Sequence, residues 1–154
     1  MKKQIKTYNE LTPKEIWDIF KLRTEVFNVE QQFIISDIDE NDLISHHLTF
    51  RNEDDELIAY LRIYLENGHS TLGRIVVPLK FRSNNYGKML VQAGIDACLE
   101  KYPDLELEIH ARDYLKRFYE SLGFVSTSEP HMFDGAPHRF MKMDYSKNQK
   151  LKTK

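Results

Sequence analysis

Residues 71–88 read TLGRIVVPLKFRSNNYGK, which predicts an apolar strand at 72–77, a loop of basic and small residues at 82–88, and then an amphipathic helix. The first backbone N–H groups of a helix have no partner within the helix, and the helix dipole favours negative charge at that end. A strand that passes through such a loop into a helix therefore predicts a phosphate site.

The spacing of this loop adds to the argument. Arg82, Asn85 and Gly87 form the pattern Arg-x-x-Asn-x-Gly. This pattern resembles the Arg/Gln-x-x-Gly-x-Gly/Ala loop that holds the pyrophosphate of coenzyme A in the GCN5-related N-acetyltransferases (GNAT). Asn85 replaces the first glycine of that loop. Asparagine is one of the few other residues that readily adopt a left-handed backbone, so the turn remains possible.

Two further segments extend the resemblance over residues 22–143. The sequence LRTEVFNVEQ at 22–31 resembles the N-terminal region of the ElaA-like branch of the GNAT family, and ARDYLKRFYESLGF at 111–124, followed by DGAPH at 134–138, is similar to its C-terminal half. The resemblance implies an α/β protein with one GNAT-like domain, built on a mixed twisted sheet of about six to seven strands flanked by about four helices. It also implies transfer of an acetyl group from acetyl-CoA to a primary amine in a ternary complex.

Composition agrees with a single domain. The chain has 154 residues, of which 41% are hydrophobic, and a formal charge of -2 gives no general attraction to nucleic acid or anionic membranes. One cysteine allows no internal disulfide, and no apolar run is long enough for a membrane helix or a signal peptide, so we expect a cytoplasmic protein. The domain is expected at 1–145 and a basic, disordered tail at 146–154. The protein could be a monomer or a homodimer.

Periodicity indicates the order of the elements. Thr12, Pro13 and Glu15 form a capping box that starts a helix, which the apolar spacing continues to about Val29. Cys98 lies on the inner face of the helix after the phosphate loop and is expected to be a buried hydrophobe. The other expected elements are strands at 47–52, 56–65, 105–110, 124–128 and 138–145, and a helix from Asp113 that ends at Gly123.

The family resemblance also implies the coenzyme-binding residues. Main-chain groups of three strand residues would pair with the pantetheine arm, and the loop would hold the pyrophosphate. Acetyl-CoA would be the co-substrate, and no metal is expected. The strand residues are Ile75, Val76 and Val77, and the loop residues are Arg82, Ser83, Asn84, Asn85, Tyr86, Gly87 and Lys88.

Tyr119 is the main catalytic candidate. It matches the tyrosine of the GNAT Tyr-x-x-x-Gly-Phe motif, and the resemblance implies that it protonates the departing coenzyme A thiolate. Its spacing with Leu115, Phe118 and Leu122 also fits a helix stripe that faces the core. Both interpretations remain open at this point.

The base that accepts the proton of the amine is harder to identify. Residues 105–110 alternate apolar and polar, so one face of that strand is polar and faces either a wet cleft or solvent. In the first case Glu108 or His110 could accept the proton, and His110 has the more suitable intrinsic pKa. Arg112 could reach a coenzyme phosphate, but we favour an ordinary surface position.

The acceptor, a small-molecule or peptide amine, could meet the carboxylates of Glu30, Asp37 and Asp39, although turn capping is the simpler role for these residues. Asp37, Asp39, Glu40 and Asp42 superficially suggest a calcium loop, but the glycine and the terminal glutamate of such a loop are missing. Two alternative functions stay open. One is an acyltransferase like the acyl-homoserine-lactone synthases, and the other is a non-catalytic module that binds acyl-CoA or a partner.

Overall fold

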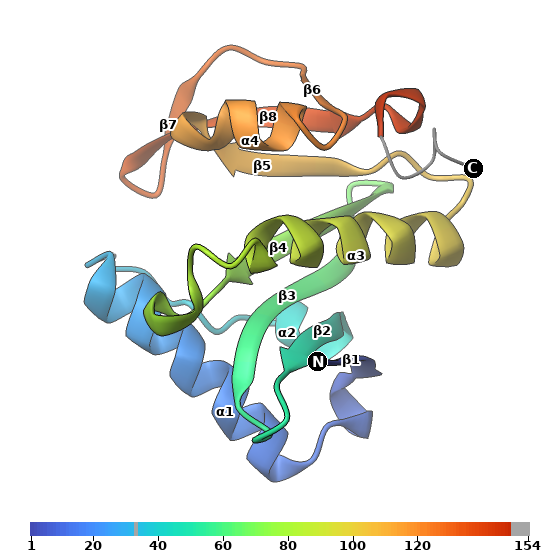
Figure 1. Ribbon diagram of the computed structural model, residues 1–154. Coiled ribbons are helices and arrows are strands. Elements are labelled where there is room, and N and C mark those ends of the chain that lie inside the picture. The colour runs from blue at the N-terminus through green and yellow to red at the C-terminus, as the bar shows by residue number, and fades with distance from the viewer. Residues whose placement is uncertain (33, 149–154) are drawn as a thin grey trace.

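Two β-sheets of four strands each carry the fold in the computed structural model, which describes residues 1–32 and 34–148 (Figure 1). The strands are β1 (Lys2–Thr7), β2 (His46–Arg51), β3 (Leu57–Glu66), β4 (His69–Val76), β5 (Glu108–Arg112), β6 (Phe124–Ser126), β7 (His131–Phe133) and β8 (Ala136–Met143). The α-helices in this part of the chain are α1 (Pro13–Arg23), α2 (Asn41–Ile44), α3 (Tyr86–Lys101) and α4 (Lys116–Glu120). A π-helix, η2 (Thr24–Glu30), continues α1, and short 3-10 turns are η1 (Tyr8–Glu10), η3 (Leu79–Phe81), η4 (Asp113–Leu115) and η5 (Tyr145–Lys147).

The first sheet has the antiparallel order β1-β2-β3-β4, and β3 is buried on both faces. Successive residues of a strand point to opposite faces. Leu61 of β3 packs in the larger core together with Leu90 of α3, whereas Tyr60 packs in a smaller core with Ile19 and Leu22 of α1. The two long helices therefore cover opposite faces of this sheet.

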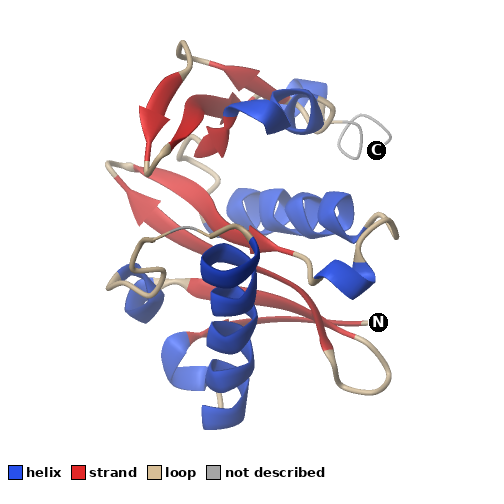
Figure 2. Ribbon diagram, turned by 90° about the vertical axis from the view of Figure 1, so that its left-hand side faces the viewer, coloured by secondary structure: helices blue, strands red, loops and turns tan. Residues whose placement is uncertain are grey.

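The second sheet has the order β5-β8-β6, and β7 pairs with the other end of β8. Within the described residues the two sheets are joined by a single parallel bridge, between Ser70 of β4 and Leu107 just before β5. Beyond the bridge β4 and β5 diverge. Figures 1 and 2 show the C-terminal part of the chain, from β5 onward, set apart from the first sheet, with α3 running alongside β4.

An irregularity in β4 accompanies this divergence. Arg62 of β3 pairs with Gly73, but Tyr60 pairs with Val76, so β4 contains one more residue than β3 over this stretch. Arg74 has a φ of 51°, in the left-handed region. Such a bulge bends a strand and increases its twist. Because it lies between the bridge at Ser70 and the end of β4, it turns the end of the strand away from β5.

The α/β class predicted from the sequence is confirmed, with two more strands than the six placed there. The additional strands, β1 and β7, are edge strands. The capping box at Thr12 is present, because Glu15 N donates to Thr12 Oγ1 and Thr12 N donates to Glu15 Oε1. The first helix extends to Glu30, but its last seven residues form the π-helix η2 rather than an α-helix.

The C-terminal boundary differs from the expected one. The sequence placed 146–154 in a tail, but the η5 turn includes residue 147, and Asn148 is fully buried. Asn148 Nδ2 donates to Leu122 O at 2.7 Å, and its side chain exchanges two hydrogen bonds with Gln92. Gly123, with a φ of 104°, lets this backbone approach, since a Cβ there would lie 3.0 Å from Asn148 N. The remaining tail, 149–154, lies outside the described residues.

The sequence also led to expectations for Cys98 and for membrane-spanning segments. Cys98 is fully buried, and burial raises the pKa of its thiol to about 11, which confirms it as a packed hydrophobe. Among the residues that the structure describes, no helix has both the length and the apolar composition needed to cross a bilayer.

Candidate functional site

Two cavities meet where β4 and β5 diverge. The first cavity, of about 940 Å³, is lined by the end of β4, the loop 82–88 and α4. The second cavity, of about 1080 Å³, is lined by β3, β4 and the second sheet. Both are lined by Gln31, Ile75, Arg112, Tyr114, Leu115 and Tyr119. The two cavities are therefore neighbours that share these residues.

The first cavity contains the open N-terminus of α3, a helix of 16 residues. Asn85 precedes this helix with φ 65° and ψ 11°, which confirms that asparagine adopts the left-handed turn. Its side chain makes no capping hydrogen bond, and the first helical hydrogen bond is from Met89 N to Asn85 O. The N–H groups of Tyr86, Gly87 and Lys88 thus have no acceptor within the helix and suit an anion.

The surroundings of Gly87 test whether a pyrophosphate fits. A Cβ placed on Gly87 would meet no heavy atom within 4 Å. The space beside the first turn of α3 is therefore open to a ligand, and the N–H groups of that turn supply the donors that a pyrophosphate needs. The residues present fit a coenzyme A phosphate.

The end of β4 supplies an open strand edge. Ile75, Val76 and Val77 line the first cavity, as the sequence predicts. One edge of β4 pairs with β3, whereas the other pairs with the second sheet only at Ser70 in the described part of the chain. Main-chain groups near Ile75 are thus available to an extended ligand, such as the pantetheine arm, in the way that a strand edge accepts an added strand.

The side chains of Arg82 and Asn84 make hydrogen bonds that stabilise the loop itself. Arg82 donates from Nε to Val77 O at 2.8 Å, and its other nitrogens donate to both carboxylate oxygens of Glu30 at 2.7 and 3.1 Å. Asn84 Nδ2 donates to Phe81 O, and Asn84 does not line the cavity. Glu30, predicted to contact the acceptor, therefore lies on the first cavity and ties the loop to η2.

Tyr119 lies between the cavities. It is only 5% exposed, its ring packs edge-on against Phe124 at 5.7 Å between centroids, and yet it lines both cavities. Burial raises the pKa of its phenol, so the hydroxyl keeps its proton at neutral pH. Both interpretations of the helix stripe are therefore compatible, because the ring belongs to the core and also forms a wall of the cavities.

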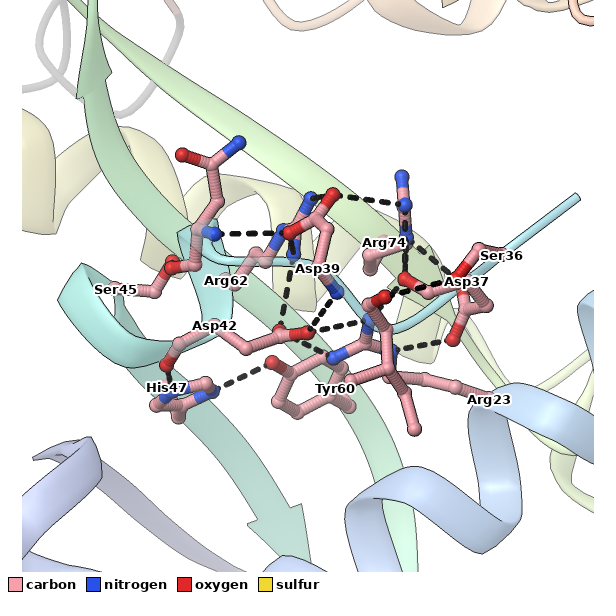
Figure 3. Close-up of polar contacts among 12 residues, drawn as sticks. Arg23, Ser36, Asp37, Asp39, Asp42, Ser45, His47, Tyr60, Arg62 and Arg74 are labelled. Atoms are coloured by element: carbon pink, nitrogen blue, oxygen red, sulfur yellow. Dashed lines mark hydrogen bonds and ion pairs between the residues drawn. The ribbon is translucent and has the colours of Figure 1, made fainter.

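One wall of the second cavity is a buried ionic cluster, which we call the arginine–aspartate network (Figure 3). Arg23 of α1 is fully buried and donates to Asp37 at 2.9 Å and to Asp42 at 2.6 Å. Three arginines and three aspartates balance in charge, which matters because unpaired buried charges are very costly. The network consists of Arg23, Arg62, Arg74, Asp37, Asp39 and Asp42.

The network neutralises the carboxylates that were predicted to bind the acceptor. Arg74 Nε lies 2.7 Å from Asp37 Oδ1, and Arg62 lies 2.7 Å from Asp39 Oδ1. Burial alone would raise the pKa of Asp39, but the hydrogen bond and charge of Arg62 outweigh it and hold this pKa below its usual range. Asp37 and Asp39 line the cavity, but as members of ion pairs and not as free anions.

The opposite wall of the second cavity is aromatic. His110 of β5 is surrounded by the rings of His131, Phe133, His138 and Phe140, with centroid distances of 4.4–4.9 Å. Burial lowers the pKa of His110 to about 4, and the neighbouring histidines add to this effect. His110 is thus neutral at physiological pH, and it faces the cleft, as one of the two sequence interpretations proposed.

Glu108 lies away from the cleft, as one of the two interpretations of its strand proposed, whereas Arg112 does not take the surface position that we favoured. Glu108 lines neither cavity, and its Oε1 lies 3.3 Å from His69 Nε2. Arg112 is not an ordinary surface arginine, because it lines both cavities and donates to Gln31 Oε1 at 2.7 Å. Among the residues described, no three His, Cys, Asp or Glu side chains are grouped to hold a metal ion.

Comparisons with known proteins place this geometry in context. Residues 21–145 match the Acetyltransferase (GNAT) domain family. A UPF0039 protein of Schizosaccharomyces pombe is 34% identical over 141 residues, which cover 90% of this chain and 94% of that protein. ElaA of Escherichia coli is 33% identical over 137 residues, covering 85% of this chain and 88% of ElaA.

Solved structures give the same picture. The crystal structure of Escherichia coli ElaA superposes with a TM-score of 0.88 at 30% identity, covering 94% of this chain and all of that one. An acyl-CoA N-acyltransferase from Pseudomonas aeruginosa superposes with a TM-score of 0.87, also at 30% identity, with the same coverage.

Proposed function

The chain belongs to the GNAT acetyltransferase family, and we propose that it transfers an acetyl group from acetyl-CoA to a primary amine by direct attack within a ternary complex. The observation that carries this proposal is the meeting of the two cavities at Tyr119. A donor in the first cavity and an amine in the second would react there without a covalent enzyme intermediate. Holding two reactants in such a geometry is itself a large catalytic contribution.

The donor supplies the acetyl group as a thioester, and the chain would bind its remaining parts. The N–H groups of Tyr86, Gly87 and Lys88 would bind the pyrophosphate, together with Ser83 and Asn85, which also line the first cavity. The main chain of residues 75–77 would orient the pantetheine arm. Arg82 would keep the loop in place through Val77 and Glu30.

The proposed reaction needs two proton transfers, one from the amine and one to the leaving sulfur. The amine must lose a proton before it can attack, and His110 would accept that proton in the second cavity. Tyr119 would donate its hydroxyl proton to the leaving sulfur. Phenols and alkyl thiols have comparable intrinsic pKa values, and burial, which raises the pKa of Tyr119, keeps the proton on its hydroxyl until negative charge develops on the sulfur.

Binding of the donor is the first test. We expect calorimetric titration to show that acetyl-CoA binds, and that a long-chain acyl-CoA binds more weakly. The complex would then be tested for coenzyme A release with simple diamines, amino acids and peptides as acceptors. A preference for the long-chain donor would favour an acyltransferase like the acyl-homoserine-lactone synthases, and failure to bind either donor would contradict the proposed function.

Gly87→Glu should separate coenzyme binding from folding. A carboxylate in the first turn of a helix interacts favourably with the helix dipole, by about 0.3–1 kcal/mol, so we expect the free energy of unfolding to stay the same or rise. The same charge would stand beside the pyrophosphate, so we expect acetyl-CoA to bind at least ~10-fold more weakly. Urea unfolding and calorimetry measure the two effects.

The matched control for that variant is Gly87→Ala. An alanine Cβ has free space at this position and adds no charge, so acetyl-CoA affinity should stay within about 2-fold. Alanine is also the better helix former, by up to about 1 kcal/mol. Unchanged acetyl-CoA binding in Gly87→Glu would place the pyrophosphate elsewhere.

A further inference from the structure

The aromatic wall of the second cavity contains two histidine rings in direct contact. His110 Nε2 of β5 lies 2.7 Å from His131 Nε2 of β7. Two ring nitrogens at this distance need one proton between them, because one must donate and the other must accept. Two imidazolium rings would oppose two N–H groups, so the pair carries at most one positive charge while this contact lasts.

The direction of this hydrogen bond follows from the far side of His131. His131 Nδ1 lies 3.2 Å from Glu129 O, and a carbonyl oxygen can only accept. Nδ1 of His131 therefore carries the proton, and its Nε2 is the acceptor in the neutral ring. His110 Nε2–H is then the donor, which leaves the lone pair of His110 on Nδ1.

We propose that His110 and His131 act together as one base, in which His110 Nδ1 takes the proton of the acceptor amine and His131 shares the resulting charge. This inference rests on the proposed function. The N–H bond of the ammonium group breaks, an N–H bond forms at His110 Nδ1, and the Nε2 proton of His110 moves toward His131 Nε2. After product release, His110 Nδ1 gives one proton to solvent, and both rings return to their starting tautomers.

His131 could compensate for the low basicity of His110. Burial is the main reason that the pKa of His110 lies below its usual value, so a proton held on His110 alone would be costly at this cavity wall. His131 lies on the edge strand β7, where the next two residues are exposed. His131 belongs to the same cavity wall, but because it lies on this edge strand, moving the charge toward it moves the charge toward water. His110 would contact the substrate, and His131 would be a positioning residue.

The other charged groups around His110 are consistent with a neutral starting state. His138 packs on the ring at 4.9 Å, and Asp134, on the turn between β7 and β8, raises the pKa of His110 but does not outweigh burial. Most of the remaining charges of the cavity are paired with each other within the arginine–aspartate network. The titratable and charged groups that line this cavity or flank His110 on β5 are His131, His138, Asp134, Asp37, Asp39, Glu66, Glu108, Arg62, Arg74, Arg112, Tyr64, Tyr114 and Tyr119.

The test begins with tautomers, which do not depend on catalysis. Long-range 1H–15N NMR of protein labelled at histidine should show His110 with its proton on Nε2 and His131 with its proton on Nδ1. His131→Gln should preserve the His110 tautomer, because the glutamine carbonyl can accept from Nε2–H. His131→Phe has no acceptor and should give a mixture of tautomers. His138→Gln is the matched control, since His138 packs at the same distance but its Nδ1 donates to Ala136 O, and it should leave the His110 tautomer unchanged.

Kinetics then test the shared charge. We expect His131→Phe to lower kcat by about 10-fold or more, within the range of general-base effects, with KM changed less than about 3-fold. His131→Gln should fall between wild type and His131→Phe, because it keeps the tautomer but cannot hold the charge. A proton on Nδ1 of His110, or a kcat of His131→Phe within 2-fold of wild type, would overturn the dyad.

The two levels of the proposal fail in different ways. An active acetyltransferase with the wrong His110 tautomer would overturn the dyad and leave the proposed function intact. The expected tautomers in a protein that binds acetyl-CoA but acetylates no amine would overturn the proposed function, and with it the catalytic role of the dyad.

Discussion

Replacing Tyr119 with phenylalanine should lower kcat for acetyl transfer by about 10²- to 10⁴-fold, the usual size of a general-acid contribution. The substitution removes only the hydroxyl, so the ring keeps its edge-on contact with Phe124 and its place in the core. Acetyl-CoA affinity should therefore stay within about 3-fold. Rates measured with saturating substrates, together with calorimetric titration of acetyl-CoA, separate the chemical step from binding.

Tyr145→Phe is the matched control for this experiment. Tyr145 is also a partly buried tyrosine packed against the main core, and burial raises its pKa to about 12, but it lines neither of the two cavities. Its loss of a hydroxyl should leave kcat within about 2-fold of wild type. If Tyr119→Phe behaved like this control while acetyl-CoA still bound, the hydroxyl would not be the proton donor. A protein that also acetylated no amine would then be better described as a non-catalytic acyl-CoA-binding module.

The second large effect concerns stability. Arg23→Met should lower the free energy of unfolding by about 3–5 kcal/mol, the usual cost of removing one partner from a buried ion pair. Arg23 is fully buried, and its loss would leave Asp37 and Asp42 with fewer partners in the interior. Urea unfolding at pH 7 measures the change. Arg82→Met is the matched control, because Arg82 also pairs with a carboxylate but is partly exposed, and it should cost no more than about 1 kcal/mol.

The same network predicts how stability depends on pH. Burial would raise the pKa of Asp42, but the hydrogen bond from Arg23 and the charges of Arg23 and Arg62 hold it below the usual value. A carboxyl whose pKa is lower in the folded state stabilises the protein above its unfolded pKa, near 4, and this stabilisation is lost as pH falls through the folded value. The loss of stability between pH 5 and pH 2 should therefore be smaller in Arg23→Met. An equal slope in both proteins would contradict the assignment.

The sequence predicted those parts of the fold that depend on local signals. The capping box at Thr12 and the left-handed turn at Asn85 follow from residue type and position, and both are present. The strands β1 and β7 were not predicted, because β1 reads KKQIKT and β7 has only three residues, so neither shows a clear apolar alternation. The π-helix η2 was also not predicted, because over seven residues the apolar spacing of a π-helix differs little from that of an α-helix.

The division into two sheets could not be read from the chain. A strand, a helix and a strand in succession predict a parallel pair, and β4 and β5 do meet in parallel at Ser70 and Leu107. The bulge at Gly73 and Arg74 then separates them. A glycine inside a strand often marks a bulge, but it does not tell which way the strand turns. The cleft that forms the site is a consequence of pairing geometry, which the sequence does not display.

The candidate site was predicted in part. Tyr119 and His110 line the cavities as expected, because a motif and an alternating strand placed them. Asp37 and Asp39 also line the second cavity, but their ion pairs were not predicted, since their arginine partners lie 14 to 37 positions away in the sequence. One signal was available: Arg62 stands in the middle of an apolar strand, where a charge needs a partner.

The buried Asn148 joins the end of the described chain to the element that carries Tyr119. Its side chain binds Leu122 O, just after α4, and also binds Gln92 of α3. A shortened protein that stops before this residue would lose both attachments and free the helix of Tyr119 to shift. A C-terminal fusion partner or affinity tag should therefore be attached after residue 148, so that the hydrogen bonds of Asn148 to Leu122 and Gln92 are kept.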